Sequence, residues 1–451
     1  MTVTATAPTT IAPDQPAGRT TSERTTPQRL RFGTAVASGL IVALLAVVVV
    51  TFTVARDAAA TVNSRAATAS SASDLYFALS DLDAEAGRLV LLGDGTSANG
   101  TDYSSPALSA LTAYNTRNQQ ADADAQQLSA GTDSPAVSTL TQEITVYRQF
   151  AAQGIALDED SFSLAGQSAP DAQGYYGIAA TLMQSTVLPE AAALRDSTSA
   201  QLASAASSAH QDAMIGAIAT GLLGLAAVLG LLVLHRRMTR WFRRRINLGV
   251  LAALLLVAGL AVAASSSLAA LSGDSSAAGS SFAGYLAVTR ARSGAYDADA
   301  AVTRYLLAPG EITGDPLTGG SDTANNPVAK ALSAANGPIF ALTPSGSAVS
   351  ARWRTVAQTD LPSITRAASD GNLGSALALD TGTARGQDAF DFYYFDSALQ
   401  GLSDSQLAAF TSASASSESS LADWDWLPWA LAGAALIAAA AGVRPRLAEF
   451  R

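Results

Sequence analysis

Residues 235–245 read HRRMTRWFRRR, which places six arginines among eleven positions between two apolar runs. The apolar runs cover 213–234 and 246–264, and a helix of roughly 20 residues is enough to cross a hydrocarbon core of about 30 Å. Arginines in short loops are held on the cytoplasmic side during membrane insertion. The stretch therefore predicts a cytoplasmic hairpin between two membrane-spanning helices.

Two further apolar runs, 33–55 and 426–443, bring the predicted spans to four. The composition agrees, because 49% hydrophobic and only 14% charged residues are too apolar for an ordinary soluble domain. The first run could instead be a cleaved signal peptide. Its apolar core exceeds the roughly 7–15 residues of such a peptide, and a long leader precedes it, so we expect an anchor.

The charges separate the two sides of the membrane. The leader 1–32, the arginine loop and the tail 444–451 sum to +10, whereas 56–212 and 271–426 sum to −12 and −8. The positive segments are expected inside the cell. We therefore predict a multi-pass protein of the cell membrane with both termini in the cytoplasm and two acidic domains outside.

The sequence indicates an internal duplication. DLDAEAGR at 81–88 aligns without a gap with DADAAVTR at 297–304, and the first and third spans start about 214 residues apart. In both halves apolar residues recur at steps of three and four, which is typical of a helix packed in a bundle. We call these residues the apolar seam of each half: Leu75, Leu79, Leu82, Ala86 and Leu89 in the first half, and Ala291, Ala295, Ala298, Val302 and Tyr305 in the second.

Clusters of Gly, Pro, Ser and Asn divide each external stretch into four helices. Turns or loops are expected at 93–105, 129–135, 158–174, 309–327 and 336–347. The predicted fold class is all-α, with four transmembrane helices and two extracytoplasmic four-helix bundles related by internal duplication. The predicted order is a disordered leader 1–32, span 33–55, bundle 56–212, span 213–234, arginine loop 235–245, span and exit 246–270, bundle 271–425, span 426–443 and tail 444–451.

Catalytic signatures are missing from the sequence. The chain has no cysteine and two histidines, and it lacks a phosphate-binding loop and a kinase motif set. We expect no enzyme activity, no catalytic residues, no cofactor and no metal. The predicted spans carry no charged residue in their middle, which argues against a pump or transporter.

One polar set stands out on the predicted helical faces: Asp81, Glu85 and Arg88, with Asp297 and Arg304 at matching positions of the second half. A spacing of three, four or seven residues places side chains on one helix face. The set is a candidate extracytoplasmic site for a ligand amino group and carboxylate, or for a protein partner. The alternative is a solvated face with intrahelical ion pairs.

Three other features have two interpretations each. The acidic run 158–160 could suggest calcium but lacks the spacing of a calcium loop, so a solvated loop is favoured. The glycosylation sequon at 99–101 is interpreted as chance in a bacterial chain. An aromatic group could form a protein interface or the bundle core: Tyr175, Tyr176, Phe390, Phe392, Tyr393, Tyr394 and Phe395.

The arginine loop fixes topology and would also meet anionic lipids, at about 1 kcal/mol per residue. A nucleic-acid site is not expected between two spans. The loop is in addition a candidate docking surface for an acidic cytoplasmic protein. Its candidate residues are Arg236, Arg237, Arg240, Arg243, Arg244 and Arg245.

The whole architecture, from the arginine-rich leader through HRRMTRWFRRR to the basic tail, resembles the actinobacterial GlnX family of four-span membrane proteins. An arginine-dominated basic set with a single lysine, Lys330, also points to an actinobacterium. The resemblance implies a link between an external glutamine-binding-type lipoprotein and the soluble serine/threonine protein kinase G. It implies no residue roles, since no diagnostic motif carries it.

The expected function is thus a signal-transducing sensor of external glutamate, aspartate or glutamine. An exterior charge of −20 is a poor trap for anionic amino acids, which favours a separate binding protein. Rival interpretations are direct ligand sensing, as in chemoreceptor-type four-helix bundles, and a structural scaffold of the cell envelope. The oligomeric state, including a homodimer, stays open.

Overall fold

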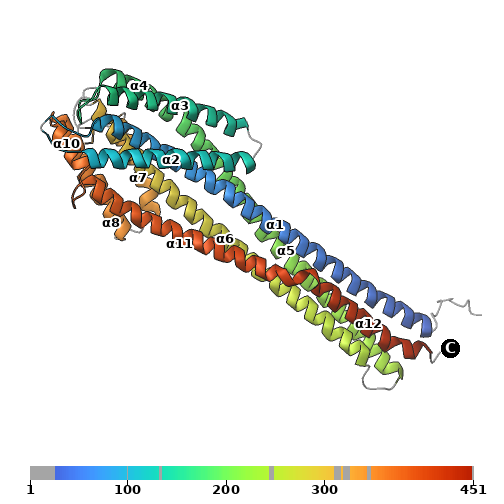
Figure 1. Ribbon diagram of the computed structural model, residues 1–451. Coiled ribbons are helices and arrows are strands. Elements are labelled where there is room, and N and C mark those ends of the chain that lie inside the picture. The colour runs from blue at the N-terminus through green and yellow to red at the C-terminus, as the bar shows by residue number, and fades with distance from the viewer. Residues whose placement is uncertain are drawn as a thin grey trace, which may run out of the picture. The chain divides into compact units, whose positions relative to one another are not determined.

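A computed structural model describes residues 26–98, 100–131, 135–242, 248–308, 316–317, 326–342 and 347–448. Over these residues the chain is helical without strands and has two isolated β-bridges, Thr96 to Asp102 and Ser97 to Ala165 (Figure 1). The predicted all-α class is confirmed. The helices of the first half are α1 (Thr26–Leu92), α2 (Ser104–Gly131), α3 (Pro135–Asp160), α4 (Pro170–Leu182), the π-turn η1 (Met183–Val187) and α5 (Leu188–Phe242).

The second half begins with α6 (Leu248–Leu307), which carries the third predicted span. The elements after it are α7 (Pro327–Leu342), α8 (Ala348–Thr355), the π-turn η3 (Val356–Asp360), α9 (Leu361–Ser369), α10 (Leu373–Asp380), α11 (Asp388–Ala422), the 3₁₀ turn η4 (Asp423–Asp425) and α12 (Leu427–Ala448). Each π-turn is followed by a Leu-Pro pair, at Pro189 and Pro362. Proline lacks the N–H that a regular α-helical turn would use, which accounts for the local rearrangement.

Among the described residues, four helical stretches are long and apolar enough to cross a membrane, as predicted. The chain divides into two compact units, and the first comprises residues 1–47, 220–263 and 426–451. Within the described part of this unit, small residues allow close helix contact: a Cβ at Gly249 would lie 2.7 Å from the Cα of Gly442. Such contacts are typical of helices that pack in lipid.

The second unit comprises residues 48–219 and 264–425, so the two predicted external bundles form one compact body. In its first half α1 to α5 surround a core that contains the predicted seam of α1. Leu75, Leu79, Leu82 and Ala86 are all buried there, together with the fully buried Tyr147. The helical periodicity predicted for this half is confirmed at those positions.

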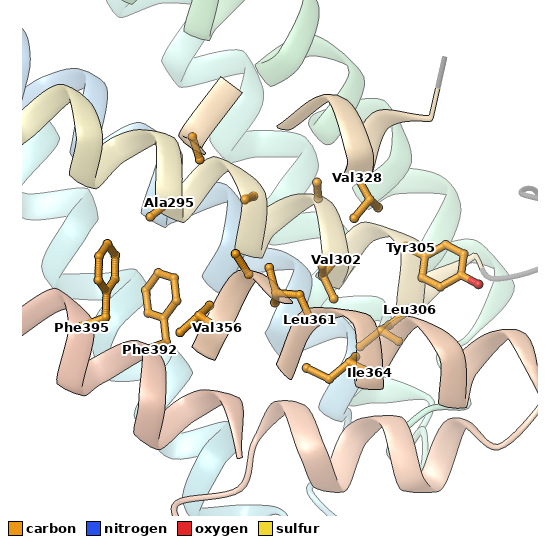
Figure 2. Close-up of a cluster of buried hydrophobic side chains, with 14 of the residues drawn as sticks. Ala295, Val302, Tyr305, Leu306, Val328, Val356, Leu361, Ile364, Phe392 and Phe395 are labelled. Carbon is orange, nitrogen blue, oxygen red and sulfur yellow. The ribbon is translucent and has the colours of Figure 1, made fainter. Parts of the chain in front are cut away.

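The second half has its own core, in which every predicted seam residue of α6 is buried. Figure 2 shows Val302 and Leu306 of α6 close to Leu361 and Ile364 of α9. Leu91 and Leu92 of α1 also belong to this core, so the two halves share buried surface. This sharing explains why the two stretches do not separate into two bodies.

Several predicted boundaries differ from the structure. The arginine stretch is not a loop throughout, since α5 continues to Phe242, and 243–247 lie outside the described residues. The prediction of a loop at 336–347 is wrong up to Leu342, because α7 continues through Pro338. The loop at 158–174 shortens to 161–169, and the leader is helical from Thr26, with 1–25 outside the described residues. The extra helix α10 departs from the four helices predicted for the second half.

Candidate functional site

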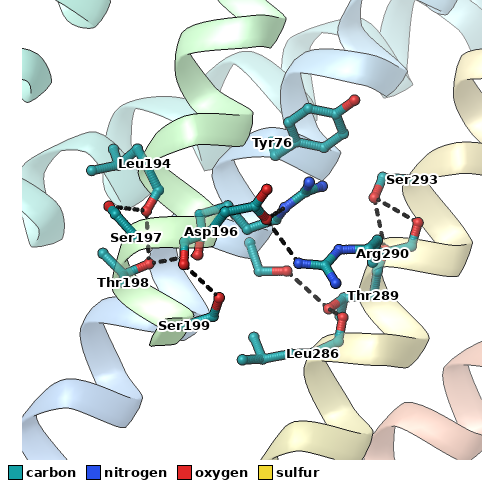
Figure 3. A network of polar contacts seen from close by, with 12 residues as sticks. Tyr76, Leu194, Asp196, Ser197, Thr198, Ser199, Leu286, Thr289, Arg290 and Ser293 are labelled. Carbon is teal, nitrogen blue, oxygen red and sulfur yellow. Dashed lines mark hydrogen bonds and ion pairs between the residues drawn. The ribbon is translucent and has the colours of Figure 1, made fainter. Parts of the chain in front are cut away.

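Helices α1 and α6 contact each other through polar side chains in the second unit. Ser73 Oγ and Thr289 Oγ1 are 2.8 Å apart, and Tyr76 Oη donates to Asp297 Oδ2 at 2.9 Å. Each helix turns its apolar seam to the core of its own half, which leaves its polar face for the other helix. Figure 3 shows the neighbourhood of this contact, where Arg290 of α6 donates to Asp196 of α5 at 2.7 Å.

Two ion pairs cross between the halves. Arg304 Nη1 of α6 lies 2.5 Å from Asp83 Oδ2 of α1, and Arg88 Nη2 of α1 lies 3.0 Å from Asp299 Oδ2 of α6. Arg88 and Arg304 match in the predicted repeat, as do Asp83 and Asp299. In a pair of units related by a two-fold axis, each contact between the units occurs twice, with the roles of the two units exchanged. The two crossed ion pairs have this pattern. The duplication itself stays a prediction.

We call the charged residues of α1 and α6 at this contact the interhelical charge cluster: Asp81, Asp83, Glu85, Arg88, Asp297, Asp299 and Arg304. The structure thus brings all five predicted extracytoplasmic site residues together. The alternative of a solvated face is wrong, because Asp81 and Glu85 are buried. Asp83 and Asp299 were absent from the predicted site, although their recurrence in the aligned octapeptides could have indicated them.

Carboxylates outnumber guanidinium groups in this cluster, and burial makes their charge costly. Arg117 of α2 adds a third cation, which pairs with Asp81. Burial still raises the pKa of Asp81 and of Asp83, and it raises the pKa of Glu85 to about 7. The pKa of at least one carboxyl group of the cluster, that of Glu85, therefore lies near neutral pH.

A groove of about 1130 Å³ opens beside the cluster in the second unit. Its polar lining includes Gln173, Tyr176, Gln184 and Arg304. Gln184 Nε2 also donates to Asp83 Oδ2 at 3.2 Å, so the groove reaches one of the crossed ion pairs. This arrangement offers a guanidinium, amides and a nearby carboxylate to a small polar molecule.

Some of the other predicted features lie in the protein interior, and others lie at the surface. Asp158 is buried and its Oδ1 accepts from the backbone N–H of Ala169 at 2.9 Å, just before α4, so it is not part of a solvated loop. Among the aromatic residues, Tyr176 and Phe395 are in the core, whereas Tyr393 is exposed. Asn99 of the sequon lies outside the described residues.

The candidate docking arginines are described in part. Arg236, Arg237 and Arg240 are exposed in the last turns of α5, and Arg240 lies in the last turn itself. A cation at a helix C-terminus interacts favourably with the helix dipole. Arg243, Arg244 and Arg245 lie outside the described residues.

Comparison with known proteins adds one finding. Residues 57–207 match the family model of the actinobacterial sensor domain. The matched range contains the α1 half of the interhelical charge cluster, including Asp83 and Arg88. No curated protein and no solved structure matches the chain. The match supports a sensing role in an actinobacterium.

A pH prediction arises at Asp124 of α2, a half-buried residue close to Asp74 of α1. Burial and the Asp74 carboxylate raise the pKa of Asp124 to about 7. Because its pKa is raised, this group stabilises the fold at low pH, and the contribution is lost as pH rises from about 4 through 7. Asp124→Asn should therefore make the unfolding temperature less dependent on pH, with a gain at pH 8 worth less than about 2 kcal/mol because solvent screens part of the side chain.

The measurement is thermal unfolding of the full chain in detergent at pH 5.5 and pH 8. Asp122→Asn is the matched control, since Asp122 lies on the same helix with an exposed side chain paired to Arg148. An Asp124→Asn chain with the same pH dependence as the parent would contradict the assignment.

Proposed function

We propose that the protein is a transmembrane sensor that relays the external availability of glutamate, aspartate or glutamine to a cytoplasmic serine/threonine kinase. A binding lipoprotein outside the membrane presents the amino acid. The observation that carries the proposal is the position of α1. This helix contains the first predicted span, lies within the sensor-domain match from residue 57 onward, and contributes Asp83 and Arg88 to the crossed ion pairs.

The mechanism rests on the continuity of the helices. α1 extends from Thr26 to Leu92 and α6 from Leu248 to Leu307 without interruption, so each joins a predicted span to the interhelical charge cluster. Helix shifts of about 1–2 Å are the usual scale of such switching. A partner that docks outside would displace α1 relative to α6 and alter the crossed ion pairs. The displacement would pass along the same helices to the membrane.

The cytoplasmic output would use the arginine stretch as a docking surface for the kinase. The exposed positions of Arg236, Arg237 and Arg240 support this step. Anionic lipids would compete for the same charges. The proposal needs no enzymatic residue in this chain, because the partner supplies the chemistry.

Crosslinking in living cells followed by mass spectrometry tests the proposal. Cells carrying the parent chain should yield crosslinks to an external binding lipoprotein and to a cytoplasmic kinase. A chain with all six arginines of 235–245 replaced by glutamine, with membrane insertion verified, should lose the kinase crosslinks and keep the external ones. Crosslinks to cell-wall proteins alone would favour the envelope scaffold instead.

Direct sensing is a second candidate, and the groove beside Arg304 favours it. A guanidinium recognises a carboxylate with two parallel hydrogen bonds, which suits an amino acid. Calorimetry of the full chain in detergent with glutamate, aspartate and glutamine separates the two candidates. Saturable binding without any lipoprotein, weakened by Gln184→Ala at the groove, would favour direct sensing.

A further inference from the structure

Three aspartates from three different helices converge in the second half of the second unit. Asp299 lies on α6, Asp380 is the last residue of α10, and Asp388 is the first residue of α11. One carboxylate oxygen from each lies within 4.8 Å of the other two. All three residues are buried, and the side chain of Asp380 is 0% exposed.

The described part of the structure does not balance these three charges. Arg88 contacts Asp299 at 3.0 Å and Asp380 only at 4.0 Å, while it also pairs with Glu85 at 2.9 Å. Four carboxylate oxygens have no hydrogen-bond partner among the described residues: Asp299 Oδ1, both oxygens of Asp380, and Asp388 Oδ1. Leaving a buried carboxylate oxygen unpaired is costly, so the arrangement is suited to a further cation.

We propose that Asp299, Asp380 and Asp388 bind one divalent cation of the oxygen-preferring class, with Ca²⁺ as the first choice. Because the three oxygens lie no more than 4.8 Å apart, a single ion can be placed within about 2.8 Å of each of them. Small side-chain movements then reach the 2.3–2.6 Å of Ca²⁺–oxygen bonds. The donor set has neither histidine nor cysteine, which argues against zinc and copper.

Because the site is enclosed, it favours a metal ion over an organic cation. Asp380 and Asp388 are at most 2% exposed, so a ligand ammonium with an attached carbon skeleton would need the helices to part. A single ion needs only the space between the oxygens. Waters or the second carboxylate oxygens would complete the six to eight ligands that Ca²⁺ takes.

The cation would join helices that are far apart in the chain. α6 and the helical stretch beginning at Asp388 are two of the four with membrane-spanning length and composition. A bound ion would therefore fix Asp388, the first residue of one such stretch, to Asp299 of α6 and to Asp380 of α10. It would also change the net charge around Asp299, with which Arg88 of the first half forms an ion pair. The inference stands independently of the proposed amino-acid signal.

The test uses the full chain in detergent, stripped with a chelator and then freed of it. Calorimetry and thermal unfolding are recorded with Ca²⁺ alone and with Mg²⁺ alone. One Ca²⁺ should bind per chain and raise the unfolding temperature, as a ligand selective for the folded state does. Asp380→Asn should weaken the binding at least about tenfold, since it removes one of three charged ligands.

Asp388→Asn gives a second, independent variant, and its result decides the matter if Asp380→Asn does not fold. Glu159→Gln is the control, because Glu159 belongs to the exposed end of the acidic run at 158–160 and should leave the binding unchanged. Tighter binding of Mg²⁺ than Ca²⁺ would keep the site and reassign the ion. Absence of stoichiometric binding of either ion would overturn the proposal, and so would binding that both aspartate variants preserve.

Discussion

Replacing Arg304 with glutamine should lower the free energy of unfolding by about 3–5 kcal/mol. Arg304 is the cation that pairs with Asp83, whose side chain is 0% exposed. Removing one partner of a buried ion pair leaves the other charged in a poorly solvated place. The measurement is denaturant unfolding of the full chain in detergent, followed by helical circular dichroism.

Two comparisons make the Arg304 result interpretable. Arg148→Gln breaks the more exposed pair with Asp122 and should cost less than about 1 kcal/mol. Adding Asp83→Asn to Arg304→Gln should restore most of the lost stability, because the uncompensated charge is gone. Equal losses for Arg304→Gln and Arg148→Gln would contradict the buried ion pair.

Replacing Trp353 with alanine should cost about 3–5 kcal/mol, the range for a fully buried large aromatic residue. Trp353 lies in the second core with its ring 4.9 Å from that of Phe395, and its Nε1 donates to Asn336 Oδ1 at 2.7 Å. Both the packing and the hydrogen bond are lost. Thermal and denaturant unfolding measure the effect.

Tyr393→Ala is the matched control for Trp353, because Tyr393 is 72% exposed although it neighbours the same core in sequence. It should change the stability by less than about 0.5 kcal/mol. Trp353→Phe should fall in between, since the ring is largely retained while Asn336 loses its donor. A loss from Tyr393→Ala as large as that from Trp353→Ala would contradict the assignment of the core.

The sequence predicts the spans and the packed helix faces well, because both depend on local pattern. The apolar runs have the length that the membrane demands, and the seam from Leu75 to Ala86 has the spacing of a buried helix face. Both signals are contained in consecutive residues. The structure accordingly confirms four candidate spans and the burial of the seam.

The contact between α1 and α6 could not be predicted in the same way. Glu85 and Arg88 have the spacing of an exposed intrahelical ion pair, and this spacing is the same whether the face meets water or a second helix. Only the tertiary structure shows that Asp299, more than 200 residues away, shares Arg88 with Glu85. Asp380 and Asp388 are likewise unmarked in sequence, because they join Asp299 only after the helices pack.

α5 continues into the arginine stretch for a local reason that the charge pattern does not indicate. Arginine and methionine are good helix formers, and HRRMTRWF contains neither glycine nor proline. The rule for topology depends on charge alone and does not distinguish a helix from a loop. The positive charge therefore predicts a side of the membrane, but it does not predict the end of α5 at Phe242.

In the proposed mechanism, an external signal reaches the cell interior through movement of α1 against α6. A reversible crosslink between the two helices tests this movement. The chain has no cysteine, so Ser73→Cys with Thr289→Cys introduces a unique pair where two hydroxyl oxygens are 2.8 Å apart. Serine/threonine phosphorylation is measured in cells after addition of glutamate, with the single Ser73→Cys chain as the control. We predict that oxidation abolishes the response of the double variant, that reduction restores it, and that the control responds under both conditions. A full response from the oxidised, crosslinked chain would contradict the claim.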